Sequence, residues 1–204
     1  MPSLRLSLNG QCLAEVDVTG LDVLTVHVSG ARVDAELANL TMTGGTYPKN
    51  VAPTFLIWLD DSTVLNEGDR VEVSFNVVGS TSHAGKTIDE LFPEEAEAPD
   101  ETNILDLLPQ VIDELRAEPY GRAGYRFAME SPRAPRYEGA TGEGDHGFGL
   151  SVLWDSSRPD RASASLHTYT LDDLEHRRPS QNRVYERLAI GDAVSLQVWT
   201  LQPV

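Results

Sequence analysis

Short runs in which apolar and polar residues alternate recur along the chain, and this two-residue period predicts β-strands. In the first 92 residues such runs predict strands near residues 4–8, 16–18, 23–28, 35–42 and 71–77. Asn9-Gly10 separates the first two runs and is typical of the type I′ turn of a β-hairpin. Residues 55–59 are apolar at every position, which predicts a buried central strand.

The second half of the chain shows the same kind of pattern. It predicts strands near residues 125–129, 148–154, 163–170, 183–188 and 193–201. Residues 130–147 are rich in Pro, Gly, Arg and Glu, which predicts a long loop. We expect Trp154 and Trp199 to fill the apolar core of this half.

Several of these positions recur at a constant separation. Leu24, Val26, Val28, Arg32 and Asp34 align with Leu150, Val152, Trp154, Arg158 and Asp160 at a shift of 126. Leu65, Gly68, Asp69, Val71, Val73 and Phe75 align with Leu188, Gly191, Asp192, Val194, Leu196 and Val198 at a shift of 123. Self-similarity at a fixed period indicates a repeated structural unit, so we interpret the chain as a tandem duplication.

A segment of different composition separates the two halves. Residues 93–102 (PEEAEAPDET) contain five acidic residues and two prolines, which is typical of a linker. After it, apolar residues recur at helical spacing: Ile104, Leu107, Leu108, Val111, Ile112 and Leu115. Pro109 lies inside this pattern and predicts either a kink or two short helices.

The predicted fold is mostly β with one or two short helices, as two tandem related β-sandwich or small-barrel domains. The predicted divisions are an N-terminal β domain (1–92), an acidic linker with an amphipathic helix (93–120) and a C-terminal β domain (121–204).

The charge of the chain limits its partners. The 204 residues contain 32 Asp and Glu but 16 Lys and Arg, giving a net charge of −16. Residues 1–102 carry −12 of this charge, because they hold 17 acidic and 5 basic residues. A negative field repels phosphate backbones and anionic membranes and attracts basic proteins. We therefore expect a basic protein partner and neither nucleic acid nor membrane as a ligand.

The single cysteine, Cys12, excludes an intrachain disulfide and favours a reducing compartment. The first residues, MPSLRLSLNGQC, lack the apolar stretch and cleavage site of a signal peptide. We therefore expect a cytoplasmic protein.

Two glycine-containing segments resemble phosphate-binding motifs only in part. Gly79-Ser80-Thr81-Ser82-His83-Ala84-Gly85-Lys86-Thr87 places serine where the P-loop pattern requires its first glycine. Thr87 and Glu90 have the spacing of a helix capping box, which is the interpretation we prefer. Residues 139–149 (GATGEGDHGFG) precede a strand and no helix, so they predict a flexible surface loop and not a dinucleotide site.

No pattern predicts a catalytic residue, a metal site or a cofactor. The five histidines, His27, His83, His146, His167 and His176, include no pair at a spacing that places two ligands on one face. His146 lies near Glu143 and Asp145, but one histidine in a loop is weak evidence for a metal site. No G-x-S-x-G motif is present. We expect a non-enzymatic protein.

Two sets of charged residues are candidate binding determinants. The first is the acidic segment Glu94, Glu95, Glu97, Asp100 and Glu101, because clustered carboxylates accelerate association with a basic partner. The second is the repeated set Arg32, Asp34, Arg158 and Asp160. These sets favour an acidic interaction protein that binds a basic protein, as inhibitor or immunity-type proteins do.

Two alternatives remain open. The first is a carbohydrate or small-ligand binding module, with Tyr47, Tyr120, Tyr137 or Trp154 lining a shallow site. The second is a hydrolase whose site lies at the interface between the two domains, because the members of a catalytic triad meet only in space.

Overall fold

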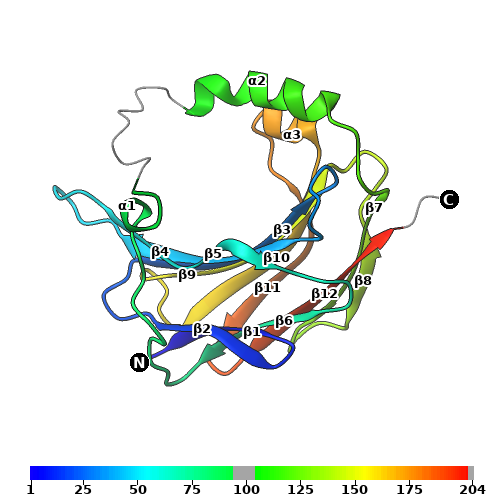
Figure 1. The fold of residues 1–204 in the computed structure, drawn as a ribbon. Helices are drawn as coiled ribbons and strands as arrows, with labels where there is room; N and C mark the ends of the chain where they lie inside the picture. Colours follow the sequence, from blue (N-terminus) through cyan, green and yellow to red (C-terminus); the bar gives the residue numbers. More distant parts are fainter. Residues whose placement is uncertain (94–103, 202–204) are drawn as a thin grey trace.

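The computed structural model describes residues 1–93 and 104–201, which form two antiparallel six-stranded sheets (Figure 1). Sheet A has the strand order β2 (Gln11–Asp17), β1 (Ser3–Leu8), β6 (Arg70–Asn76), β12 (Ala193–Leu201), β7 (Gly124–Glu130) and β8 (Tyr137–Ala140). Sheet B has the order β11 (Gln181–Ala189), β10 (Arg161–Tyr169), β9 (Gly147–Asp155), β3 (Val23–Ala31), β4 (Asn39–Thr46) and β5 (Thr54–Val64). The prediction of a mostly β fold is confirmed.

The strands follow the alternating pattern because one side of each sheet faces the core. In β3, Leu24, Val26 and Val28 are buried, whereas the side chains between them point outward and are half-buried. Asn9 and Gly10 have φ angles of 52° and 81°, the left-handed values that the predicted type I′ turn requires. The hairpin expected at residues 4–18 is therefore confirmed.

The two halves of the chain have the same strand order. From its outer edge to its middle, sheet A contains β2, β1 and β6 of the first half on one side and β8, β7 and β12 of the second half on the other. In sheet B the corresponding sets are β5, β4, β3 and β11, β10, β9. The halves meet where β6 pairs with β12 and where β3 pairs with β9, so each sheet in Figure 1 contains colours from both ends of the sequence. The division at residues 92 and 120 stays a prediction.

One hydrophobic cluster fills the space between the sheets and draws on both halves. It includes Leu4 and Val73 from the first half and Phe127 and Val152 from the second. Phe148 is one of its fully buried members, and its ring centroid lies 4.7 Å from that of Tyr125 and 4.9 Å from that of Phe127. Aromatic pairs at these distances add to the burial of apolar area, so the two halves stabilise each other through this core.

The described residues form three helices: α1 (Ile88–Leu91), α2 (Ile104–Ala117) and α3 (Leu171–Glu175). Pro109 lies within α2, which continues through it as one helix. Helices α2 and α3 lie against each other on the side of sheet B that faces away from sheet A (Figure 1). Ile112 of α2 is 1% exposed, and Arg116 pairs with Asp172 of α3 at 2.9 Å. None of these helices is long and apolar enough to span a membrane.

Some local expectations were wrong. Residues 55–59 belong to β5, which is the outermost strand of sheet B and not a central one. Trp58 enters the core, and segment 83–92 pairs with the outer edge of β5 through Ile57 and Lys86, whereas Phe55 stays exposed. Trp199 faces outward beside Arg126, whereas Trp154 is buried in the core as expected.

The loop predicted over residues 130–147 contains a strand, β8. The region predicted as a flexible surface loop, residues 139–149, is also held in place at Asp145 and His146. Asp145 and His146 are buried, and Asp145 accepts hydrogen bonds from the backbone N–H of Gly142 and from the guanidinium of Arg183. These contacts hold the loop against the sandwich.

Candidate functional site

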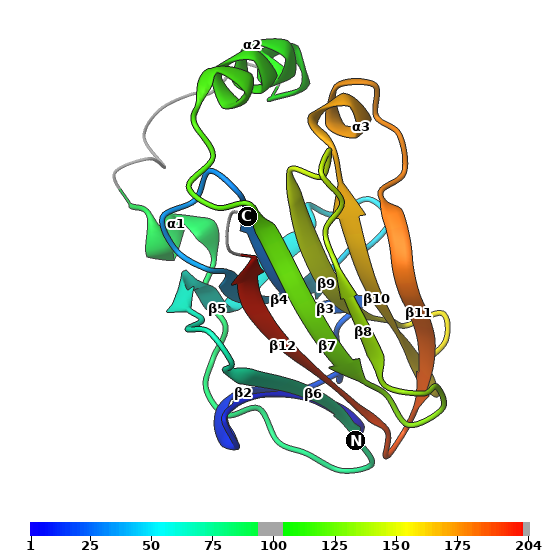
Figure 2. The same cartoon turned by 90° about the vertical axis from the view of Figure 1, so that its right-hand side faces the viewer.

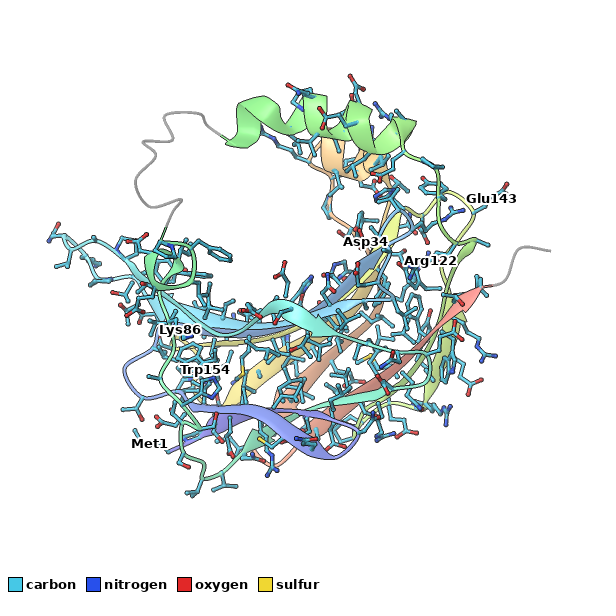
Figure 3. The ribbon with its side chains drawn as sticks, in the orientation of Figure 1. Met1, Asp34, Lys86, Arg122, Glu143 and Trp154 are labelled. Atoms are coloured by element: carbon cyan, nitrogen blue, oxygen red, sulfur yellow. The ribbon has the colours of Figure 1, made fainter. Side chains whose placement is uncertain are left out.

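Strand β5 and segment 83–92 form the surface of the first half that carries both exposed apolar side chains and carboxylates. The two are joined by paired backbone hydrogen bonds between Ile57 and Lys86, with N···O distances of 2.8 and 2.9 Å. Lys86 lies beside α1 in Figure 3. We define the α1–β5 surface as Phe55, Asp60, Asp61, Ile88, Asp89, Glu90 and Phe92.

Helix α1 presents its side chains outward because it is short and held by its cap. Thr87 Oγ1 accepts a hydrogen bond from the backbone N–H of Glu90, and the Glu90 carboxylate accepts one from the backbone N–H of Thr87. The predicted capping box is confirmed. None of the four residues of α1 is buried, so the cap fixes a projecting turn instead of an element of the core.

Three large apolar side chains of this surface are exposed to solvent. Ile88 is 50% exposed, Phe92 is 44% exposed and Phe55 is 40% exposed. A single exposed apolar residue is ordinary. Three on two adjoining segments, bordered by carboxylates, have the composition of a binding patch with an apolar centre and a polar rim.

The carboxylates of this surface have little cationic compensation. Asp60 and Asp61 come from β5, Asp89 and Glu90 come from α1, and Lys86 lies between the two segments. Hydrogen bonds from Ser62 lower the pKa of the Asp60 carboxyl, with a smaller contribution from the charge of Lys86. Asp60 therefore stays ionised at neutral pH and contributes to the negative field.

Carboxylates elsewhere in the first half are also rarely paired with a cation. Within residues 1–93, the only carboxylate in an ion pair is that of Glu72, which lies 3.8 Å from Arg70. The other ion pairs of the described residues use carboxylates of the second half. The other carboxylates of residues 1–93 thus have no cation within ion-pair distance.

A small pocket of about 160 Å³ opens at the α1–β5 surface, between Trp58, Asp60, His83, Lys86 and Leu91. Trp58 is 8% exposed, and its indole N–H has no hydrogen-bond partner among the described residues. His83 Nε2 lies 2.8 Å from the Trp58 carbonyl oxygen. A buried donor without an acceptor is costly, so the Trp58 indole N–H is a destabilising feature beside this pocket.

The predicted acidic residues Glu94, Glu95, Glu97, Asp100 and Glu101 lie outside the described residues. They follow α1 directly in the sequence, because α1 ends at Leu91. Only Pro93 therefore separates the acidic segment from Phe92 of the α1–β5 surface in the sequence.

The predicted residues Arg32 and Asp34 contact the backbone of the loops at one end of the sandwich. Arg32 donates to the carbonyl oxygens of Arg122 and Glu143, and its guanidinium lies 3.9 Å from the centre of the Tyr120 ring. Asp34 accepts from the backbone N–H of Ala31 at 2.7 Å, and Figure 3 places it near Arg122. The sequence missed Arg122, whose guanidinium donates to the Asp34 carbonyl oxygen at 2.6 Å.

The corresponding residues of the second half make different contacts. Asp160 lies 3.3 Å from Arg161, its neighbour in the chain, and Arg158 closes a turn through its backbone N–H, which donates to Asp155. Arg158 and Asp160 do not form an ion pair in the described residues, and neither do Arg32 and Asp34. The structure therefore does not bring the repeated charges together as equivalent pairs.

The sequence also missed a group of polar side chains on the outer face of sheet B. His27 Nδ1 lies 2.8 Å from Ser151 Oγ, and the ring centroids of His27 and His167 are 6.2 Å apart. The group joins β3, β9 and β10, and both rings border Gly149. Burial lowers the pKa of both histidines. The alternation in residues 23–28 places His27 outward, but only the pairing of the strands brings the three side chains together.

The described residues contain no group of three or more His, Cys, Asp and Glu side chains arranged to hold a metal ion. The segment that resembles a P-loop, residues 79–87, instead contacts β2 through Thr81 and Ser82. Comparisons of the chain with the models of known families, with curated proteins and with solved structures found no match.

Proposed function

We propose that this protein is a non-enzymatic interaction protein that binds a basic protein through the α1–β5 surface and the acidic segment that follows it. The observation that supports this proposal is that Ile88, Phe92 and Phe55 lie on the same two segments as carboxylates that form no ion pair among the described residues. An apolar centre supplies affinity, and the surrounding charge accelerates encounter and selects the sign of the partner.

The charge and cysteine content of the chain bear on its ligands and location. A net charge of −16 disfavours nucleic acids and anionic membranes as ligands. A cytoplasmic location fits the single cysteine, Cys12, which is free and half-buried. The mirrored strand order of the two halves supports an origin by tandem duplication. A basic enzyme inhibited by this protein is the partner class that best fits such a surface.

A photo-crosslinking experiment tests the proposed partner. A benzoylphenylalanine replaces Ile88 in one variant and Tyr185, which is exposed on β11, in a second. We expect the Ile88 variant to capture a protein of net positive charge that the Tyr185 variant does not capture. The purified partner should then lose affinity as salt is raised from about 50 to 200 mM, because screening weakens charge attraction. Equal capture by both variants, or capture of an acidic partner, would contradict the proposal.

A charge-neutral variant tests the surface itself. Replacing Asp60, Asp61, Asp89 and Glu90 by their amides should weaken the captured partner's binding by about tenfold or more. A matched variant neutralises Glu36, Glu118, Glu138 and Glu143, which are exposed elsewhere in the chain. Both variants lose the same net charge, so an equal effect would show that the field of the whole molecule acts and the α1–β5 surface does not.

A second candidate is the binding of a small polar ligand, and one observation favours it. The outer face of sheet B carries His27, Ser151 and His167 beside hydroxyl side chains of β3, β4 and β10, among them Thr25, Thr41, Thr43, Ser29, Ser163 and Ser165. Such rows of hydrogen-bonding groups on a rigid sheet suit a carbohydrate. Chemical shift changes in the His27 and His167 rings on adding monosaccharides would support this candidate, and unchanged rings at saturating sugar would exclude it.

A further inference from the structure

Strands β2 and β8 are equivalent outer strands of sheet A, because the strand order of the two halves is mirrored. The registers relate the two edges position by position. Ser74 of β6 aligns with Gln197 of β12 at the shift of 123. Arg5 lies opposite Ser74 and pairs with Glu15 of β2, whereas Ala128 lies opposite Gln197 and pairs with Glu138 of β8. Glu138 and Ala140 therefore occupy in the second half the edge positions that Glu15 and Asp17 occupy in the first.

In the first half, residues 79–82, which belong to no strand, cover this edge. The backbone N–H of Ser82 donates to the Glu15 carbonyl oxygen at 2.7 Å, and the Ser82 hydroxyl accepts from the Glu15 N–H at 3.2 Å. Thr81 Oγ1 accepts from the N–H of Asp17 at 3.2 Å. Gly79 approaches so closely that a Cβ atom there would clash with the side chains of Ser3 and Glu15. This contact shows the kind of segment that the edge accepts.

In the second half, the equivalent edge has no such cover among the residues that the structure describes. The N–H of Thr141 donates to the Tyr125 carbonyl oxygen. Hydrogen-bonded and non-hydrogen-bonded pairs alternate in an antiparallel ladder, so the backbone groups of Ala140 and Glu138 point away from β7. Strand β8 pairs with β7 alone, and β7 separates it from β12 in Figure 2.

A hollow of about 440 Å³ adjoins this edge, on the outer face of β7, β8 and β12. Small residues, Ala128, Gly139 and Ala140, line it together with Trp199 and Leu201. The Arg126 guanidinium lies 4.8 Å from the centre of the Trp199 ring. Binding clefts for small groups are of this size and are mostly apolar, so the hollow suits an apolar side chain.

We propose that β8 binds an extended peptide segment of a partner protein by strand addition, at the edge equivalent to the one that residues 79–82 cover on β2. The main chain of the segment bonds to Ala140 and Glu138, and one apolar side chain packs against Trp199 in the hollow. Arg136 of the hollow is paired with Glu130 and Glu138, but Arg126 forms no ion pair among the described residues and repels a basic segment. We therefore expect this partner segment to be neutral or acidic. The surface is separate from the α1–β5 surface and does not depend on its role.

A peptide titration tests the proposal. The probe is the acetylated, amidated peptide VVGSTSHA, which copies residues 77–84. We expect saturable chemical shift changes in the amides of Glu138 and Ala140 and in the Trp199 indole N–H, with a Kd of about 1 mM or below. A second peptide carries Ser82→Pro and lacks the N–H that donates to Glu15 in the first half. It should bind about tenfold more weakly or not at all.

Variants of the protein test the same contacts, because they change the residues that bind the peptide. Ala140→Pro removes the edge N–H and should weaken the peptide by about tenfold, whereas Ala140→Ser keeps the N–H and should bind within about twofold. Trp199→Ala leaves the edge intact and should weaken binding about fivefold through the lost apolar contact. This variant keeps the proposal testable if the proline variant fails to fold.

Five results would overturn the proposal. The first four are the absence of saturable shifts up to about 5 mM peptide, equal binding of the proline peptide, shifts confined to β11, and shifts of β8 that depend on protein concentration without peptide, which would report a dimer. Binding by a chain ending at Leu201 but not by the full chain would assign the edge to the chain's own end and would also overturn it.

Discussion

His27 and Ser151 form a hydrogen bond, with 2.8 Å between Nδ1 and Oγ, across the boundary where the two halves of the chain meet in sheet B. His27 lies on β3 and Ser151 on β9, directly opposite each other in the ladder. His167 of β10 lies near both, and burial lowers the pKa of the two histidines. The group is therefore neutral at pH 7 and is sensitive to any change that crowds or protonates the rings.

Gly149 leaves the space that the two rings occupy, so we expect Gly149→Ala to destabilise the protein. A Cβ atom there would lie 2.7 Å from His167 Nε2 and 3.0 Å from His27 Cε1. Moving the rings should lower the free energy of unfolding by about 1–3 kcal/mol, which urea denaturation would show as a lower midpoint. The double variant Gly149→Ala/His167→Ala removes the clash with His167 and should recover part of this loss. A double variant that is no more stable than Gly149→Ala would contradict this explanation.

Acidification should destabilise the fold through three histidines. Burial lowers the pKa of His27, His146 and His167, whereas each has a pKa of about 6.5 in the unfolded chain. Between the two values the unfolded chain binds more protons, so the free energy of unfolding falls as pH falls below about 6.5. The loss is complete once pH has passed below the pKa values of the folded state.

Urea midpoints measured from pH 8 to pH 5 test this pH dependence. The variant His27→Gln/His167→Gln removes two of the three groups and should show a shallower decline than the parent. His176→Gln replaces an exposed histidine and serves as the control that should leave the decline unchanged. A parent protein equally stable at pH 5 and pH 8 would show that burial of these rings has no linkage to folding.

Tyr125 ties the second half to the first, so we expect Tyr125→Phe to be destabilising despite its conservative shape. Its hydroxyl donates to the Ala31 carbonyl oxygen at 2.6 Å, and burial raises its pKa far above the usual value. Loss of this buried hydrogen bond should cost about 1–2 kcal/mol in urea unfolding. Tyr185→Phe, at a residue that is exposed, should stay within about 0.5 kcal/mol of the parent. Equal effects of the two variants would contradict this role.

Residue patterns predicted much of the fold, because each strand has one face in a common core and therefore alternates apolar and polar residues. The alternation in residues 23–28 and 71–77 and the turn at Asn9-Gly10 predicted strands and a hairpin that the structure contains. The capping box of Thr87 and Glu90 was predicted by spacing alone, because both partners lie within one turn of helix. Local patterns thus predicted local structure well.

The pairing between the halves could not be predicted in the same way. The contacts between β3 and β9 join residues about 125 positions apart, and the two strands carry no signal that selects one partner over another. Strand β8 was missed because its sequence, YEGA, has no apolar alternation. The group of His27, Ser151 and His167 depends on these pairings. The hydrogen bond between His27 and Ser151 could therefore be identified only once the strand order was known.

The candidate site was predicted only in its charge. The imbalance of the first half indicated a negative surface, but the exposed apolar side chains Ile88 and Phe92 had no distinctive pattern in the sequence. Their exposure follows from the shortness of α1, which leaves none of its residues in the core. Which apolar residues remain at the surface is decided by tertiary packing, so it required the structure.

The cap of α1 offers a way to disturb the α1–β5 surface without disturbing the fold. Thr87→Ala removes the hydroxyl that accepts from the Glu90 N–H, at a local cost of about 1 kcal/mol. Because α1 buries no residue, the urea midpoint should hardly change, while amide exchange of Glu90 and Leu91 should accelerate about fivefold. Thr87→Ser keeps the acceptor and should exchange like the parent. A large fall in the urea midpoint of Thr87→Ala would mean that α1 supports the core, and the view of α1 as a projecting binding turn would then be wrong.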